Sequence, residues 1–169
     1  MRSVAEQFLE PWDVSETAIV LLVPKGNPKS IQTLVDLSRP GLKLGVPNAQ
    51  QSALGALAAN ILREAGLLDA VMANVKAQTP TADLLVNQMR TGSLDAVIVF
   101  EANTSQVRDT LDIVRLSVLG AHAVQPYAVG KNSNHRFLME RLLAAIQSPE
   151  SRQRFESVGF HWRQATNAP

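Results

Sequence analysis

The residues best suited to chemistry are small hydroxyl side chains at two places where helices are expected to begin. Ser52 opens a predicted helix over residues 52–65, and Thr79-Pro80-Thr81 opens another that runs to residue 90. The free N–H groups and the dipole at a helix N-terminus favour a negatively charged ligand. Ser52 and Thr79 would also serve as simple N-caps, and the two roles can coexist. The pattern therefore predicts two helix starts whose backbone N–H groups lack intrahelical acceptors.

Residues that support catalysis or metal binding form no recognisable pattern. The chain has no cysteine, which excludes disulfides, cysteine-based zinc sites and a thiol nucleophile. The three histidines, His122, His135 and His161, lack metal-like spacing, so structural roles are favoured. Nucleophile-elbow, dinucleotide-binding and Walker patterns are missing from the sequence. We therefore expect no enzyme, no catalytic residue, no metal and no cofactor.

Composition limits the partners. The chain has 169 residues, of which 46% are apolar and 18% charged, typical of a folded globular protein. Its net charge of +1 and scattered basic residues give no reason to expect nucleic acid or an anionic membrane. The N-terminal residues lack the apolar segment of a signal peptide. The longest apolar run, Ala18–Val23, is too short to span a bilayer.

Strands and helices alternate along the chain. The continuous apolar run at residues 17–23 predicts a strand buried on both faces of a parallel sheet. Further strands are expected at residues 42–46, 71–77, 94–100, 113–116 and 124–129. Helices are expected at residues 2–9, 30–38, 52–65, 79–90, 134–147 and 149–158, with a partly helical segment at 101–110 and a loose tail from 163. This alternation predicts an α/β fold with a largely parallel sheet.

A set of short markers, in a fixed order, resembles one protein family. The markers are Leu21–Pro28, Leu34–Leu37, Lys43–Val46, Gly66–Asp69, Gly92–Val99, Pro126–Val129 and Ser148–Phe160. Over residues 17–162 the chain resembles the second half of a type II periplasmic solute-binding protein, most of all the molybdate-binding members of ABC importers. The fold implied is a parallel or mixed sheet flanked by helices, with one complete lobe and part of a second.

The resemblance also implies a domain division. Residues 26–120 would form the complete lobe two. Residues 1–25 and 121–169 would form a partial lobe one with its hinge strands. The early strands and helices of lobe one have no counterpart here, and in the family these hold half of the oxyanion. The chain would therefore carry half of a binding site.

Site residues follow from the same resemblance. The family presents backbone N–H groups to the anion at the positions of Leu54 and Thr81, next to Ser52, Ala53 and Thr79. Many molybdate binders place a tyrosine hydroxyl at the end of the strand that here reads Val97–Phe100, and the aligned position is Val99. Glu101 follows that strand, and a carboxylate near an anion would repel it unless protonated or paired. We expect Glu101 to be a solvated residue that begins a helix.

The function implied is that of the solute-binding component of an ABC-type importer. It would bind a small oxyanion such as molybdate or tungstate by lobe closure, outside the cytoplasm, and deliver it to the transporter's membrane subunits. A ligand-sensing effector domain of a regulator with the same fold is the alternative. An enzyme that reuses the fold would need a catalytic constellation, and the sequence offers none.

The missing part of lobe one leads to an expectation about assembly. The strands at residues 17–23 and 124–129 would leave apolar edges exposed, and such edges invite pairing with another chain. We therefore expect a homo-oligomer or a strand-exchanged dimer.

Overall fold

The computed structural model describes residues 6–163 and divides into two compact units. Unit 1 comprises the chain up to Thr17 and from Val124 onward, and unit 2 comprises Ala18–Ala123. Two strands, β1 (Trp12–Pro24) and β6 (His122–Tyr127), each run from one unit into the other. Half of the helix predicted at residues 2–9 and nearly all of the predicted tail lie outside the described residues. Residues 6–7 form a short 3-10 turn, and Phe8 bridges Gly130.

The sheet of unit 2 is mixed, as the fold resemblance allowed. Its order is β3 (Val75–Thr79), β2 (Leu44–Pro47), β4 (Ala96–Phe100), β1, β5 (Leu111–Arg115). β2 runs parallel to β3 and β4, whereas β1 is antiparallel to β4 and β5. The expectation of a largely parallel sheet was therefore wrong for β1. A continuous apolar run indicates that a strand is buried on both faces. It does not indicate whether the strand runs parallel or antiparallel to its neighbours, because both arrangements bury the same side chains.

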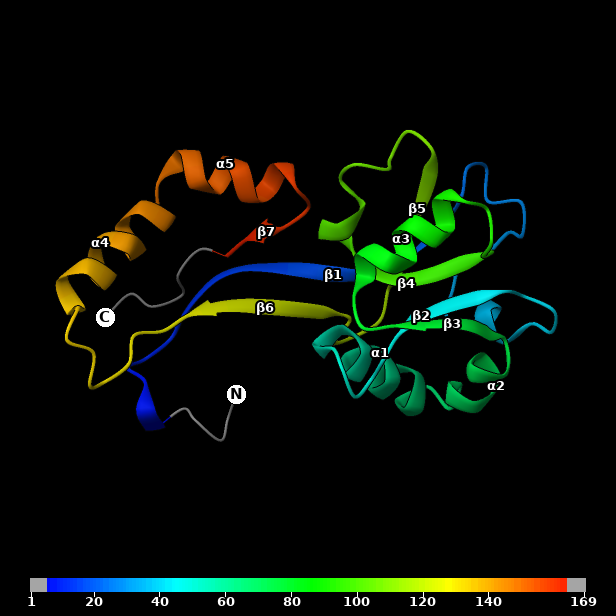
Figure 1. Cartoon of the computed structure of the whole chain (residues 1–169), viewed down its shortest axis with the longest axis horizontal. Helices are drawn as coiled ribbons and strands as arrows, with labels where there is room; N and C mark the ends of the chain where they lie inside the picture. The colour runs from blue at the N-terminus through cyan, green and yellow to red at the C-terminus, as the bar shows by residue number, and fades with distance from the viewer. Residues whose placement is uncertain (1–5, 164–169) are drawn as a thin grey trace. The chain divides into compact units, whose positions relative to one another are not determined.

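The alternation of side chains along β1 divides the core of unit 2 into two layers. Ile19, Leu21 and Val23 belong to a cluster shared with helices α1 (Ala53–Glu64) and α2 (Leu68–Ala73). Val20 and Leu22 belong to a second cluster shared with α3 (Ala82–Arg90). Helices α1 and α2 thus cover one face of the sheet and α3 covers the other (Figure 1). The predicted double-sided burial of β1 is confirmed.

The helix expected at residues 30–38 is mostly a loop. Only the 3-10 turn η2 (Val35–Ser38) is helical, and Ser30 has a φ of 50°, outside the helical region. The Asn27 side chain closes this loop, because it accepts from the Ile31 N–H at 3.0 Å and donates to the Ile31 carbonyl at 2.8 Å. Local amide hydrogen bonds of this kind compete with helix formation.

Two further boundaries differ from the sequence expectation. Val71 lies in α2 and is fully buried in the first cluster, so the expected strand at residues 71–77 is displaced to β3. Helix α3 has Thr81 as its N-cap, and Thr79 is the last residue of β3. Pro80 therefore precedes the helix instead of occupying its first turn. Short apolar segments fit a helix or a strand equally well, and packing decides between them.

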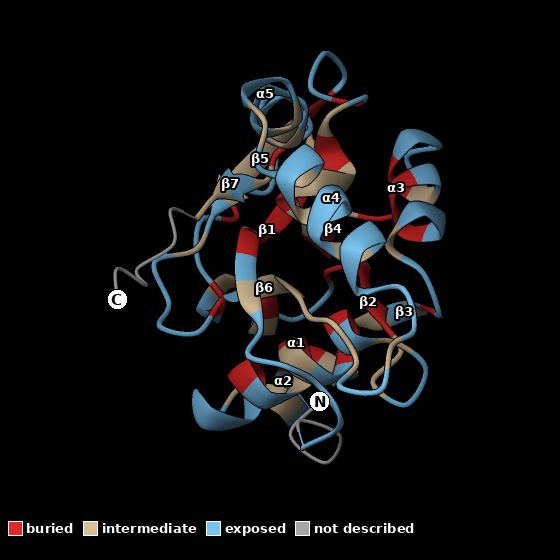
Figure 2. Ribbon diagram, turned by 90° about the vertical axis from the view of Figure 1, so that its left-hand side faces the viewer, coloured by how far each residue is buried: buried red, intermediate tan, exposed pale blue. Residues whose placement is uncertain are grey.

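Unit 1 contains the remaining elements, α4 (Arg136–Ile146), α5 (Pro149–Ser157) and the unpredicted strand β7 (His161–Trp162), which pairs with β1. The rings of Phe160 and Trp162 each meet that of Phe155 edge to face, with centroids 5.7 and 5.6 Å apart. Neither α4 nor α5 contains a buried residue (Figure 2). Among the described residues of unit 1, Val14 is the one buried hydrophobic side chain. The large core thus belongs to unit 2.

Candidate functional site

Four strands of unit 2 end at the same edge of its sheet. β2, β3 and β4 are mutually parallel, and Pro47 lies opposite Thr79 in the register of β2 and β3. On the other side of β4, Phe100 lies opposite Ile19 of β1, and Arg115 of β5 lies opposite Val20. The carboxyl ends of strands in such sheets are where ligands usually bind. We call this set of strand ends, with the segments that follow them, the strand-end edge.

Helix α1 begins at the strand-end edge, after a tight polar turn. The Ser52 hydroxyl accepts a hydrogen bond from the Gly55 N–H at 2.9 Å, which confirms Ser52 as the N-cap. The turn packs closely on the helix, since a Cβ on Gly55 would lie 2.3 Å from the Asn48 carbonyl oxygen. The N–H groups of Ala53 and Leu54 come before that of Ala56, which donates to the Ser52 carbonyl in the first intrahelical hydrogen bond, so they suit an external anion. Leu54 itself is buried, and Ala53 is exposed.

Helix α3 begins beside this turn. The Asn48 N–H donates to the Thr79 carbonyl at 2.8 Å, which joins the segment leading into α1 to the segment leading into α3. The Thr79 hydroxyl donates to the Thr81 carbonyl at 2.8 Å, so Thr79 shapes the turn and is not the cap. Thr81 is exposed and, within the described chain, its side chain forms no capping hydrogen bond. The structure therefore brings together the segments of Ser52, Ala53, Leu54, Thr79 and Thr81.

Val99 is placed differently from these five residues. Its side chain has no exposed surface and packs in the cluster beneath α3 with Val20 and Leu22. The strand continues one residue further to Phe100, which is half-buried and packs against the cluster on the α1 face. Because side chains alternate along a strand, Phe100 and not Val99 is the partly exposed side chain at the strand-end edge. In the sequence, Phe100 is the last residue of the apolar run, and that was the signal that could have identified this position.

Glu101, the next residue, is buried and paired, so the expectation of a solvated residue was wrong. Its side chain is 4% exposed and binds the Arg115 guanidinium, with Nη2 2.5 Å from Oε1. Arg108 Nη2 lies 3.9 Å from the same oxygen. Glu101 begins the 3-10 turn η3 (Glu101–Thr104), and the Thr104 hydroxyl donates to its carbonyl. The hydrogen bond from Arg115 to Glu101, and then their charge attraction, raise the pKa of Arg115.

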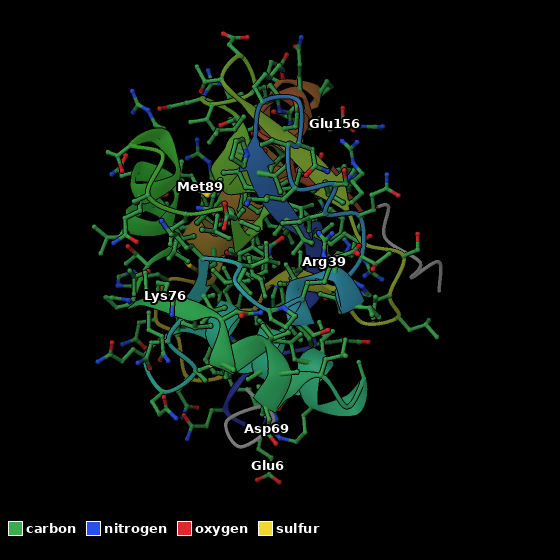
Figure 3. All side chains as sticks on the ribbon, turned by 90° about the vertical axis from the view of Figure 1, so that its right-hand side faces the viewer. Glu6, Arg39, Asp69, Lys76, Met89 and Glu156 are labelled. Carbon is green, nitrogen blue, oxygen red and sulfur yellow. The ribbon has the colours of Figure 1, made fainter. Side chains whose placement is uncertain are left out.

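Two hollows open on unit 2, and the first of them reaches Gln50 in the turn before α1. One, of about 340 Å³, lies along α1 and α2, and its lining includes Arg63 and Asp69, the latter in the first turn of α2 (Figure 3). The other, of about 530 Å³, lies between α3 and η3 and includes Asp83 and Asn103. None of the six residues predicted to bind ligand lines either hollow. The predicted donors are thus part of the strand-end edge rather than of these hollows.

Residues 6–163 include no cluster of three or more histidine, cysteine or acidic side chains arranged for a metal ion. Within the same residues, none of the helices has the length and apolar character needed to cross a bilayer. These two findings leave the helix N-termini and the Arg115–Glu101 pair as the chemically distinctive features of unit 2.

Comparisons with known proteins agree on one family. The family described as bacterial extracellular solute-binding protein matches residues 9–161. The molybdate-binding protein ModA of Mycobacterium bovis is 26% identical over 164 residues, which cover 95% of this chain and 61% of ModA. The chain thus spans about 61% of the length of the curated relatives that it matches.

Solved structures share the fold. The periplasmic molybdate-binding protein of Azotobacter vinelandii has a TM-score of 0.73 at 18% identity, and the match covers 96% of this chain and 74% of that one. The sulfate-binding protein SubI of Mycobacterium tuberculosis has a TM-score of 0.68 at 18% identity, covering 90% of this chain and 58% of SubI. Relatives of this fold therefore bind more than one oxyanion.

Proposed function

Because the chain belongs to the bacterial extracellular solute-binding protein family, we propose that it is the solute-binding component of an ABC-type importer. Its family makes it a binding protein and not an enzyme, as the sequence predicted. The ligand that we propose is a small oxyanion, with molybdate and tungstate as the first candidates. The observation that supports this ligand most directly is the hydrogen bond from Asn48 to Thr79, which joins the starts of α1 and α3.

The two helix starts offer neutral donors for a charged ligand. The free N–H groups at the start of each helix carry partial positive charge, and the dipole of each helix adds to it. Backbone donors need no particular side chain, so Leu54 and Thr81 can keep this role whatever their chemistry. Neutral donors also avoid the desolvation cost of burying an unpaired cation beside the ligand.

We further propose that unit 2 carries half of the site, in line with residues 26–120 as lobe two and residues 1–25 and 121–169 as part of lobe one. The other half would come from the part of lobe one that the relatives have beyond the length matched here. Binding by lobe closure, an extracytoplasmic location and delivery to transporter membrane subunits belong to the same proposal. They are supported by family membership and by the molybdate-binding relative.

Isothermal titration of the 169-residue chain with molybdate, tungstate, sulfate and phosphate tests the proposal. We expect binding of at least one anion, with substitutions Ala53→Asp and Thr81→Asp each weakening it by about 10-fold or more through charge repulsion. Aspartate is favourable at a helix N-terminus, so neither substitution should lower the melting temperature. Loss of binding without loss of stability would then report on the anion itself.

Ala70→Asp is the matched control, because Ala70 is an exposed alanine near the start of α2, outside the strand-end edge. It adds the same charge to unit 2 and should leave anion affinity unchanged. The proposal fails if no anion binds the unmodified chain. It also fails in its structural part if Ala53→Asp and Thr81→Asp bind the anion as well as Ala70→Asp does.

A further inference from the structure

The strand-end edge carries formal charge in addition to helix N-termini. Glu101 is buried where β4 ends, Arg115 is the last residue of β5, and Arg108 lies between them in the chain. Both guanidinium groups approach the same carboxylate oxygen, at 2.5 Å for Arg115 and 3.9 Å for Arg108. Two guanidinium groups against one carboxylate leave one net positive charge. This arginine cluster is absent from the half-site predicted from the sequence.

The register of the sheet places the cluster on the same face as α3. Val20 lies opposite both Val99 of β4 and Arg115 of β5, and residues directly opposite each other project to the same face. Val20 and Val99 pack in the cluster beneath α3, so Arg115 leaves the sheet on that face. Asn103 of η3 donates to Asp83 in the first turn of α3 at 3.3 Å. The turn that contains Glu101 is therefore joined to the start of α3.

Arg115 is held by a buried group and is nevertheless accessible. Its partner Glu101 is 4% exposed, whereas the Arg115 side chain is 68% exposed. A guanidinium group has five N–H donors in one plane, and one carboxylate oxygen does not use them all. Arg115 can thus keep its bond to Glu101 and still donate to a ligand. Glu101 is a positioning residue, because it fixes the guanidinium group at the end of the sheet.

We propose that Arg115 is a specificity-determining residue of the half-site and that it selects doubly charged over singly charged tetrahedral oxyanions. This inference rests on the proposed anion-binding function of the same edge. Backbone N–H groups carry only partial positive charge, so the extra attraction that they give to a doubly charged anion is smaller than that from a full charge. A formal positive charge adds an attraction that grows with the charge of the ligand. Charge-assisted hydrogen bonds from arginine are also stronger than those from neutral donors.

Tungstate and perrhenate test this inference, because both are tetrahedral tetraoxo anions of heavy metals, with charges of −2 and −1. Titration calorimetry on the full chain should show tighter binding of tungstate. Arg115→Gln should weaken the affinity for tungstate about 10- to 100-fold, which is the range for loss of a charged hydrogen bond. It should change the affinity for perrhenate by less than about 5-fold. Arg115→Lys should keep part of the preference, since it keeps the charge and loses the planar donor group.

Two further variants control for charge and for folding. Arg63→Gln removes the same charge in the last turn of α1, at the opposite end from its N-terminus, and should retain the preference. Arg115→Gln leaves Glu101 buried with a weaker partner, which can destabilise the fold. The double substitution Glu101→Gln with Arg115→Gln removes that buried charge as well. Its melting temperature should be close to that of the unmodified chain, and it should still lack the preference for tungstate.

Each outcome decides the inference. Loss of the preference in both Arg115→Gln variants, but not in Arg63→Gln, supports it. Equal preference in Arg115→Gln and the unmodified chain overturns it and leaves the proposed oxyanion function intact. Equal binding of the two anions by the unmodified chain also overturns it. If the unmodified chain binds neither anion nor the four anions named above, the proposed function fails, and this inference with it.

Discussion

At the scale of single residues, two partly exposed aspartates stabilise loops by accepting hydrogen bonds from nearby N–H groups. Asp36 accepts from the Gln32 and Thr33 backbone N–H groups at 3.0 and 2.8 Å, and these bonds lower its pKa. Asp112 accepts from the Lys25 side chain, 3.0 Å away, and from the Gly26 N–H at 2.8 Å, and its pKa is lowered for these reasons. Both carboxylates thus favour the ionised form in the fold.

Asp36 predicts a pH-dependent contribution to stability. A carboxyl group with a lowered pKa in the folded state stabilises the fold above its unfolded pKa, about 3.9 for aspartate. The contribution disappears as the pH falls through the lower folded value. Asp36→Asn should therefore unfold more easily than the unmodified chain at pH 7 in urea, with the difference shrinking below about pH 4. Two denaturation curves that stay equally far apart at pH 7 and pH 2.5 would contradict this.

Phe100 predicts how anion affinity responds to one hydroxyl group. The resemblance aligns a ligand-contacting tyrosine with Val99, but Phe100 is the half-buried side chain at the end of this strand. Phe100→Tyr should tighten molybdate binding about 2- to 10-fold, the net value of one hydrogen bond. Val99→Tyr is the matched control, since Val99 has no exposed surface. It should cost about 1–3 kcal/mol of stability through overpacking and add no affinity. Titration and thermal melting separate the two results.

At the scale of elements, the two helices that form the strand-end edge begin differently. The Ser52 side chain caps α1 by accepting from the Gly55 N–H. The Thr81 side chain, within the described chain, makes no such bond at the start of α3. Thr79 instead fixes the turn through the Thr81 carbonyl. Two helix starts that look alike in sequence are therefore stabilised by different hydrogen bonds.

Because of this difference, we predict that two similar substitutions lower the free energy of unfolding by unequal amounts. Ser52→Ala removes a capping bond and should destabilise the chain by about 1 kcal/mol in chemical denaturation. Thr81→Ala removes no capping bond and should change the free energy of unfolding by less than about 0.5 kcal/mol. The two variants serve as controls for each other. An equal loss in both would mean that Thr81 caps α3 in solution.

For Gly55 we predict that a glycine-to-alanine change in a helix lowers the free energy of unfolding, which is the opposite of its usual effect. Alanine normally stabilises a helix interior by about 1 kcal/mol relative to glycine. Here the added Cβ would lie 2.3 Å from the Asn48 carbonyl oxygen and 2.8 Å from the Ala49 nitrogen. Gly55→Ala should therefore destabilise the chain, by about 1–3 kcal/mol, and weaken anion binding because the turn before α1 must move. A melting temperature equal to or above that of the unmodified chain would refute this close packing.

At the scale of the whole molecule, hydrophobic burial is unequal between the two units. Unit 2 contains both core clusters, whereas unit 1 buries Val14 alone among its described hydrophobic residues. Phe137, Leu138 and Leu142 of α4 are 73%, 56% and 45% exposed. Adjacent exposed apolar side chains of this kind usually mark a surface that another polypeptide covers.

We therefore expect the predicted homo-oligomer to form through a different surface from the one that the sequence suggested. Residues 17–23 of β1 do not form an exposed edge, because β4 pairs with Ile19–Leu22 and β5 with Val20–Pro24. We expect self-association at high micromolar concentration through α4, measured by analytical ultracentrifugation, and its loss in Phe137→Lys. Leu119→Lys is the matched control, since Leu119 is 99% exposed in unit 2 and should not affect association. A monomer at every concentration would contradict the prediction.

Much of the fold and part of the site were predictable from local patterns. The apolar run of β1 predicted a strand buried on both faces, and Ser52 predicted the start of α1. Such patterns report burial and short-range hydrogen bonds, which depend on neighbouring residues. The ordered markers also sufficed to predict the family. Boundaries that depend on packing, such as Val71 in α2 and the start of α3 at Thr81, were missed.

The sequence by itself determined that the run at residues 17–23 is buried on both faces, where most strands and helices lie, and that the chain belongs to a solute-binding protein family. Only the tertiary structure decided the direction of β1, the burial of Val99 and the pairing of Glu101 with Arg115, 14 residues away. The physical reason is that hydrophobic periodicity is the same for parallel and antiparallel neighbours. A buried charge is stable only with a partner that the fold brings to it, and local sequence patterns do not indicate which residue that partner is.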